Sequence, residues 1–339
     1  MSRLGLFFTL IVVTASAVAQ SSVLTPVQRT PVVGVDERTF SLLMLPIACD
    51  EQGRTYARLS RTNPQVDDPL LRISPKGTVE VRFGTTGETL TPYAIRHDGG
   101  VVMVRLEGDK FLDYFSPEGN RQSSVRLEVP PIRFFPSQLA VFQSGEIFVA
   151  GQQIKPSYKA SAAIYAATGS LIKQLTLIED ETREREIAND SATQKLNARA
   201  INQSVATAGD DGLVYLMRPT NPALIYAISR DGEVVHTFPV APPAGAGGLE
   251  LGLRVINNRI VIQYRRDCGP AVKGCIGSVF AVLDSTSGKT LAVYTSDNRE
   301  VAGMIACYVP DPDRFFLLSL SAQGHGWDIV EARAKEGSQ

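Results

Sequence analysis

The stretch QLAVFQSGEIFVAG (residues 138–151) is followed closely by AAIYAATGSLIKQLTL (162–177). Each stretch contains an apolar strand, a short turn and a second apolar strand. Gly145 and Gly169 lie in the turns, where glycine tolerates the positive φ that tight hairpins require. Together the two stretches predict four consecutive antiparallel strands, which is the composition of one blade of a β-propeller.

The same two hairpins recur along the whole chain. The second hairpin follows the first at a short distance: Gly77 lies 24 residues after Gly53, and Gly119 lies 19 residues after Gly100. Two hairpins per unit give a repeat of about 40–55 residues, which is typical of propeller blades. The first hairpin returns at 41–59, 93–106, 204–217, 251–264 and 304–320, and the second at 70–83, 111–128, 224–240 and 278–295.

Six first hairpins and five complete second hairpins predict an all-β fold, a six-bladed β-propeller in a single domain over residues 20–339. The sixth unit ends in WDIVEARAK (327–335), which provides one further strand. The segment Val23 to Val35 precedes the first unit, so we predict that this N-terminal strand completes the sixth blade and removes an exposed sheet edge. The charged segment Glu179 to Arg199 predicts one inserted helix, with a charged loop as the alternative.

The N-terminus has the pattern of a signal peptide, residues 1–19. Arg3 precedes the apolar stretch Leu4 to Ala17, and Ala17-Val18-Ala19 forms a small-residue cleavage site before Gln20. The apolar stretch is shorter than the roughly 20 residues that span a bilayer. We therefore expect an exported protein, periplasmic or extracellular, with no membrane span after cleavage and a monomeric state.

Composition argues against one class of partner. The 339 residues carry a net charge of -1, and 44% of them are hydrophobic. No basic run alternates with aromatic residues, so we expect no nucleic acid to bind.

The second hairpins share a short motif that carries a family resemblance. SPKG (74–77), SPEG (116–119), SRDG (229–232) and STSG (285–288) occupy matching places in their units. In this the chain resembles six-bladed propellers of the NHL-repeat and TolB-like type. The resemblance implies the fold, and through the TolB-like proteins it suggests a role in the cell envelope.

Four cysteines predict two disulfide pairs, because an even number of cysteines in an oxidising compartment favours bridges over metal sites. Cys268 and Cys275 flank GPAVKG, and we expect a bond between them. Cys49 and Cys307 end the first and the sixth inner strand, which are neighbours in a closed ring. We expect these two to lie close together, either bonded or as buried thiols.

The candidate ligand-binding residues are mostly basic and lie near the links between hairpins. Long links gather on one face of a propeller, where binding sites usually form. The alternative is that the arginines solubilise and protect strand ends, since Asp67 and Asp68 on the same face offset their charge. The candidates are Arg58, Arg105, Lys155, Arg218, Arg254, Arg265, Arg266, His325 and Trp327.

The predicted inner strands carry few groups for catalysis. They contain almost no carboxylates, whereas a metal-dependent lactonase needs several oxygen ligands at the axis. Asn202 and Gln203 provide amides on these strands, and Arg254 provides the clear charge. We therefore expect no metal and no cofactor, and a non-enzymatic scaffold that binds a protein or a small anionic ligand on the long-loop face. A lactonase- or lyase-like propeller enzyme is the alternative.

Overall fold

The computed structural model of the chain describes residues 21–35, 40–61, 68–84, 92–107, 109–128, 133–155, 159–175, 201–219, 223–267, 277–296, 301–321 and 326–335. The regular elements in these residues are strands, apart from one short 3₁₀ helix at Ile201–Gln203. The predicted helix at Glu179 to Arg199, the signal peptide, His325 and the Cys268–Cys275 pair lie outside these ranges.

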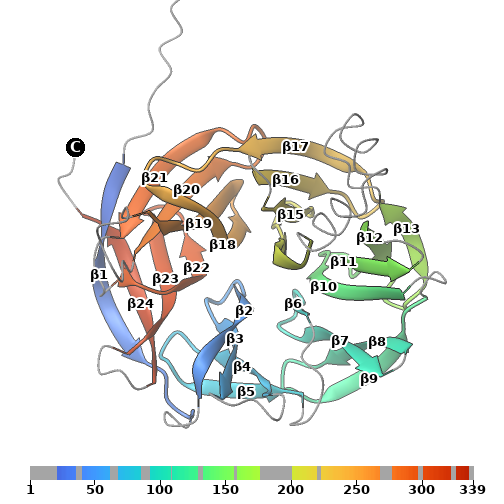
Figure 1. Ribbon diagram of the computed structural model, residues 1–339. Helices are drawn as coiled ribbons and strands as arrows, with labels where there is room; N and C mark the ends of the chain where they lie inside the picture. Colours follow the sequence, from blue (N-terminus) through green and yellow to red (C-terminus); the bar gives the residue numbers. More distant parts are fainter. Residues whose placement is uncertain are drawn as a thin grey trace, which may run out of the picture.

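Consecutive strands form four-stranded antiparallel sets arranged in a ring around a central axis, as in a β-propeller (Figure 1). Four sets are separate sheets. These are β2 (Phe40–Cys49), β3 (Thr55–Arg61), β4 (Leu70–Ile73) and β5 (Val79–Phe83); β6 (Tyr93–Ile95), β7 (Val101–Glu107), β8 (Asp109–Phe115) and β9 (Arg121–Arg126); β10 (Arg133–Val141), β11 (Ile147–Lys155), β12 (Lys159–Tyr165) and β13 (Leu171–Leu175); and β14 (Val205–Ala208), β15 (Val214–Arg218), β16 (Ala223–Ile228) and β17 (Val234–Val240).

The remaining eight strands form one continuous sheet. It contains β18 (Ala246–Ile256), β19 (Arg259–Arg266), β20 (Ser278–Asp284) and β21 (Thr290–Ser296), followed by β1 (Ser21–Pro31), β24 (Trp327–Ala334), β23 (Arg314–Leu320) and β22 (Met304–Val309). The predicted count of six blades is not confirmed, because these eight strands form one sheet and not two. Two of the four-stranded sets are joined because β1 pairs with a neighbour on each side.

The N-terminal strand closes the ring as predicted. Leu24 to Pro31 pairs antiparallel with β24, and Ser21 to Val23 pairs parallel with β21. Beyond the strand, the Val33 amide donates to the Gly77 carbonyl at 2.8 Å, which reaches the set that begins with β2. The segment from Ser21 to Val33 therefore contacts three consecutive sets of the ring.

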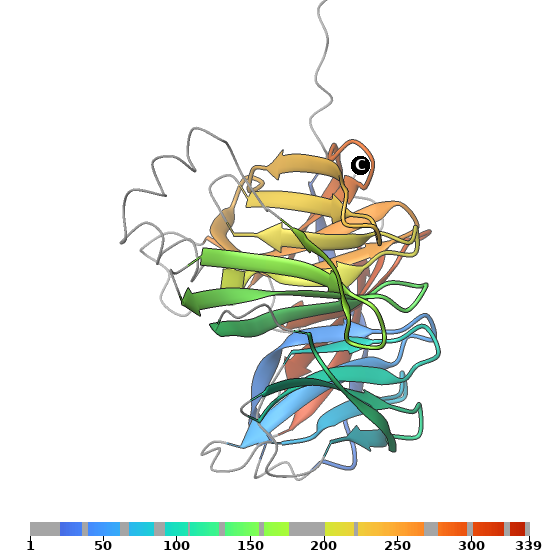
Figure 2. The ribbon, with the colours of Figure 1, turned by 90° about the vertical axis from the view of Figure 1, so that its right-hand side faces the viewer.

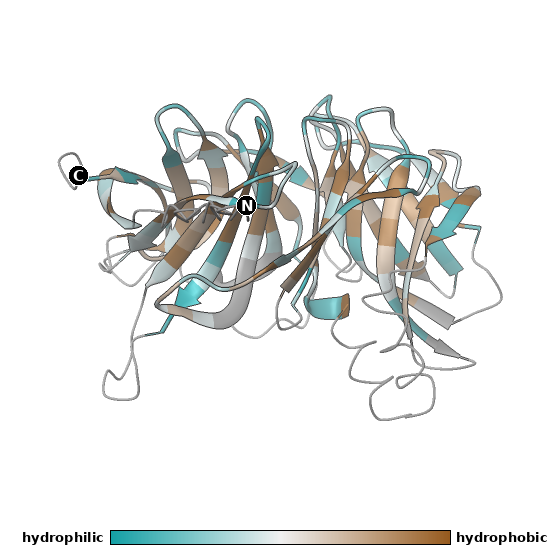
Figure 3. Ribbon diagram, turned by 90° about the horizontal axis from the view of Figure 1, so that it is seen from above, coloured by the Kyte–Doolittle hydropathy of each residue, from teal (hydrophilic) through white to brown (hydrophobic). Residues whose placement is uncertain are grey.

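Buried apolar side chains fill the junctions between neighbouring sets. Tyr56 and Phe83 meet Val101 and Phe115 between the β2–β5 and β6–β9 sets. Ile47, Leu59, Leu318 and Trp327 meet between the β2–β5 set and the set that contains β22 to β24. Each set is thus held mainly by its two neighbours around the ring. Figure 3 shows the apolar strands, with polar turns along one edge.

The short hairpin turns all lie on one face of the ring, here called the turn face, on one side of Figure 2. The strand ends at which the links between hairpins begin and end lie on the opposite face, here called the long-loop face. In the first hairpin of the β6–β9 set the positive φ belongs to Gly99, next to the predicted Gly100.

The glycine of each second hairpin turn packs against the preceding outer strand. At Gly119, with φ +88°, an added Cβ would lie 2.7 Å from both the Arg82 carbonyl oxygen and a Val81 methyl. Comparable close contacts surround Gly77, Gly169, Gly232 and Gly288. The repeated glycine therefore provides both the turn and the contact between neighbouring sets.

We expect Gly119→Ala to lower the free energy of unfolding by about 1–3 kcal/mol more than Gly145→Ala does. Gly145 is the matched control, because it also has a positive φ (+102°) but nothing lies within 4 Å of an added Cβ. Denaturant unfolding of the two variants measures the difference. Equal losses would show that the close contact between sets contributes nothing.

Candidate functional site

Arg254 lies at the axis and connects three inner strands. Its Nε donates to the Ala306 carbonyl and its Nη2 to the Ile305 carbonyl, both at 2.7 Å on β22. Nη2 also donates to the Ile47 carbonyl on β2, and Nη1 donates to the Leu253 carbonyl on its own strand β18 at 2.6 Å. One side chain thus holds together the inner strands of three consecutive sets.

The environment of Arg254 contains dipoles rather than an opposite charge. Desolvation lowers the pKa of Arg254 to about 10, and the nearby Tyr93 opposes this shift. The guanidinium remains charged at neutral pH. No carboxylate in the described part of the chain forms an ion pair with it.

A cavity of about 150 Å³ lies beside Arg254 on the long-loop face, here called the long-loop pocket. Its described lining carries uncharged polar groups around the single charge of Arg254. Asn202 and Gln203 come from the 3₁₀ helix, which the buried side chain of Ile201 anchors. The Asn202 amide donates to the Gln152 side chain at 3.1 Å. The lining residues are Pro46, Ile47, Ser137, Gln138, Asn202, Gln203, Ser204, Val205, Gly252, Arg254, Met304 and Ile305.

A second cavity, of about 180 Å³, lies on the turn face, and Arg254 lines it as well. Its charged groups have partners within the described residues. His97 Nδ1 lies 3.0 Å from Glu51 Oε1, Asp50 pairs with Arg54 at 2.6 Å, and Asp210 accepts the Asn257 amide. The described lining of this pocket thus contains carboxylates, whereas that of the long-loop pocket contains none. The side chain of Arg254 therefore separates two axial pockets that open on opposite faces.

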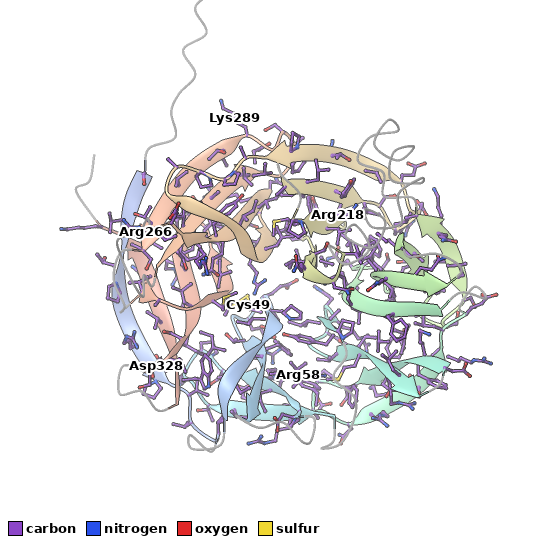
Figure 4. All side chains as sticks on the ribbon, in the orientation of Figure 1. Cys49, Arg58, Arg218, Arg266, Lys289 and Asp328 are labelled. Carbon is purple, nitrogen blue, oxygen red and sulfur yellow. A yellow bond between two sulfur atoms is a disulfide. The ribbon has the colours of Figure 1, made fainter. Side chains whose placement is uncertain are left out.

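A disulfide joins Cys49 and Cys307 beside this axis, with their Cα atoms 5.5 Å apart and their sequence positions separated by 258. Of the two alternatives for this pair, the structure confirms the bond. Figure 4 shows Cys49 near the centre of the ring. The bridge links β2 to β22, the same two strands that Arg254 connects.

The structure distributes the predicted basic residues around the ring instead of gathering them at one mouth. Figure 4 shows Arg58, Arg218 and Arg266 in three different sets. Arg105 pairs with Asp113 at 2.7 Å and stacks on the Phe111 ring. Arg254 is the member of the predicted group that lines both axial pockets.

The other predicted residues differ in their exposure. Arg58 and Arg218 are buried, and Arg58 Nη2 lies 3.4 Å from the sulfur of Met103. Arg265 is exposed and Arg266 is half-buried at the end of β19. The backbone of Lys155 ends β11. Trp327 is 6% exposed within an apolar cluster, so the structure places it in the core and not in the wall of a pocket.

Sequence reasoning missed several residues of the long-loop pocket. Gln138 and Ser137 stand in the predicted inner strand, but nothing in the local pattern distinguishes them from structural polar residues. Only their position beside Arg254 reveals their place in the lining.

In the described residues, no group of three or more His, Cys, Asp or Glu side chains is arranged to hold a metal ion. No helix in the described ranges has the length and apolar character to cross a membrane.

Comparisons with known proteins find similar folds. No protein-family model and no curated protein matches the sequence. A protein of unknown function from Dyadobacter fermentans aligns at 10% identity with a TM-score of 0.49, covering 92% of this chain and 99% of that one. YCF48 bound to D1 peptide aligns at 10% identity and TM-score 0.44, covering 93% and 97% of the two chains. The Dos1 propeller aligns at 10% identity and TM-score 0.43, covering 85% and 77%. At this identity the similarity concerns the fold alone.

We expect the double variant Cys49→Ala/Cys307→Ala to lose about 2–5 kcal/mol of unfolding free energy. The bridge closes a loop of 258 residues, which restricts the unfolded chain strongly. Denaturant unfolding without reductant measures the loss, with the reduced wild type as the control.

Mass spectrometry of a non-reducing digest checks both predicted cysteine pairs. Free thiols at Cys49 and Cys307 would contradict the structure, and free thiols at Cys268 and Cys275 would contradict the second predicted bridge.

Proposed function

We propose that this chain is an exported, non-enzymatic β-propeller that acts as a binding scaffold, with its site at the long-loop pocket. The observation that supports this proposal is the polar lining of that pocket. Side chains from the β10 strand, the 3₁₀ helix and β18 converge there on one face of a rigid ring. Such concave sites with a few converging polar groups are the usual binding sites of proteins.

The chemistry of the lining supports binding more than catalysis. Serine hydroxyls and the amides of Gln138, Asn202 and Gln203 donate and accept hydrogen bonds without titrating near neutral pH. Proton transfer needs a group such as histidine or a carboxylate within reach, and the described lining of this pocket offers none. A lactonase- or lyase-like activity therefore has less support.

Export is part of the proposal. A disulfide bond is typical of oxidising compartments, which agrees with a periplasmic or extracellular location. Three points stay predictions from the sequence: the signal peptide, the monomeric state and the resemblance to NHL-repeat or TolB-like propellers. The partner class is a protein or a small anionic ligand on the long-loop face.

We expect the full chain, expressed with its own N-terminus, to be recovered outside the cytoplasm with Gln20 as its first residue. Cell fractionation and N-terminal sequencing of the recovered protein measure this. An Ala17→Arg/Ala19→Arg variant is the control, since signal-peptide cleavage needs small residues at these positions. Recovery of the intact chain in the cytoplasm would contradict the export proposal.

We expect Asn202→Ala/Gln203→Ala to lose a partner that the wild type captures from the exported fraction, while Gln143→Ala keeps it. All three residues are exposed, and Gln143 lines the turn-face pocket, so it is a matched amide on the opposite face. Affinity capture followed by titration with the purified partner measures the effect. Equal binding by both variants, or a loss at Gln143 alone, would place the site elsewhere.

A further inference from the structure

Arg254 differs from the other partly buried arginines whose partners are seen in the structure. Arg29 pairs with Asp328 at 2.6 Å, Arg54 pairs with Asp50 at 2.6 Å, and Arg259 pairs with Asp313 at 2.8 Å. Arg254, in contrast, is bonded by carbonyl oxygens. A charge withdrawn from water is normally paired, because desolvation without an opposite charge is costly. Among the described residues, Arg254 is therefore a buried charge without a direct ion pair, and the long-loop pocket that it lines contains no described carboxylate.

The hydrogen bonds of Arg254 leave one donor unused. A guanidinium has five N–H groups. The described residues accept four: one from Nε, one from Nη1 and two from Nη2. The fifth, on Nη1, has no acceptor within the described residues. Arg254 lines the long-loop pocket together with Gln138, Asn202 and Gln203, whose amides carry further N–H donors, although one Asn202 N–H already donates to Gln152.

Charge and size limit the ligand. Arg254 provides the single charge in the described lining, so a group with one negative charge matches it, whereas a phosphate dianion would remain half unmatched. The volume of about 150 Å³ is below the range of roughly 300–1,000 Å³ for drug-sized ligands. Such a space fits a small acid or the end of a chain.

We propose that the long-loop pocket binds a carboxylate, which pairs with Arg254 through Nη1 and accepts hydrogen bonds from the surrounding amides. This inference rests on the proposed binding function and names its ligand chemistry. The carboxylate belongs either to a free small carboxylic acid or to the C-terminus of a peptide. Both sources present the same planar, singly charged group.

Calorimetric titration of the full mature chain with defined probes tests the proposal. Acetate and butyrate represent free acids, and tetraglycine with a free or an amidated C-terminus represents a peptide end. Inorganic phosphate and chloride are the anion controls. We expect saturable binding of at least one carboxylate probe and at least tenfold weaker binding of both control anions. Preference for tetraglycine over its amide identifies a peptide terminus, and preference for acetate or butyrate over tetraglycine identifies a free acid.

Variants locate the bound probe. Asn202→Ala/Gln203→Ala should weaken carboxylate binding about tenfold, and Gln143→Ala should leave it unchanged. Arg254→Gln should abolish it. Because Arg254 also holds three strands, Gln138→Glu is the second test. It places a carboxylate in the pocket, and it should displace the probe while the chain remains folded by circular dichroism.

The pH profile provides an independent readout. Binding should be constant from pH 6 to 9 and fall about tenfold per unit once the probe carboxyl is protonated, below about pH 4–5. Absence of saturable binding, equal binding of phosphate, or equal loss in Gln143→Ala would overturn the inference. If the captured partner still depends on Asn202 and Gln203 while no carboxylate competes with it, the scaffold function stands and this inference fails. If neither the captured partner nor a carboxylate binds at the long-loop pocket, the scaffold function and this inference both fail.

Discussion

The structure depends on holding together the two ends of a ring. The β2 and β22 strands are neighbours in space although more than 250 residues separate their paired cysteines. Three kinds of contact act at this seam: the Cys49–Cys307 bond, the guanidinium of Arg254 on the carbonyls of both strands, and β1, which completes the sheet beside β24. The covalent bond acts mainly by restricting the unfolded chain. The other two satisfy backbone groups that an open ring would leave exposed.

Closure is also what creates the long-loop pocket. Ile47, Ser137, Val205 and Arg254 come from four different sets of strands and meet only when the ring is complete. Because each set packs mainly on its neighbours, a displacement at the seam changes the spacing of the inner strands around the axis. The contacts that stabilise the seam therefore also fix the geometry of the proposed site.

The fold was predictable at positions where the occurrence of a residue type has a single physical explanation. The turn glycines at 77, 119 and 169 mark positions that need a positive φ, and the matching places of Cys49 and Cys307 indicated neighbouring strands. The joining of two sets through Ser21 to Val23 was not predictable, because a parallel pairing of three residues has no sequence pattern of its own. The site was only partly predictable. An arginine within a strand has the same kind of sequence context whether it pairs, as Arg105 does with Asp113, or lines a pocket, as Arg254 does.

In the proposed site, Arg254 has two roles that divide the N–H groups of one guanidinium between them. The four N–H groups that hold the strands are unavailable to a ligand, so a carboxylate reaches the charge through one N–H and depends on the amides for the rest. With only one guanidinium N–H available, the ligand cannot form the stronger bidentate pair. The site therefore favours selectivity for the charge and shape of the ligand over high affinity. It also couples binding to stability. A ligand that neutralises Arg254 offsets its desolvation in the folded state alone, and so it strengthens the seam on which its own site depends.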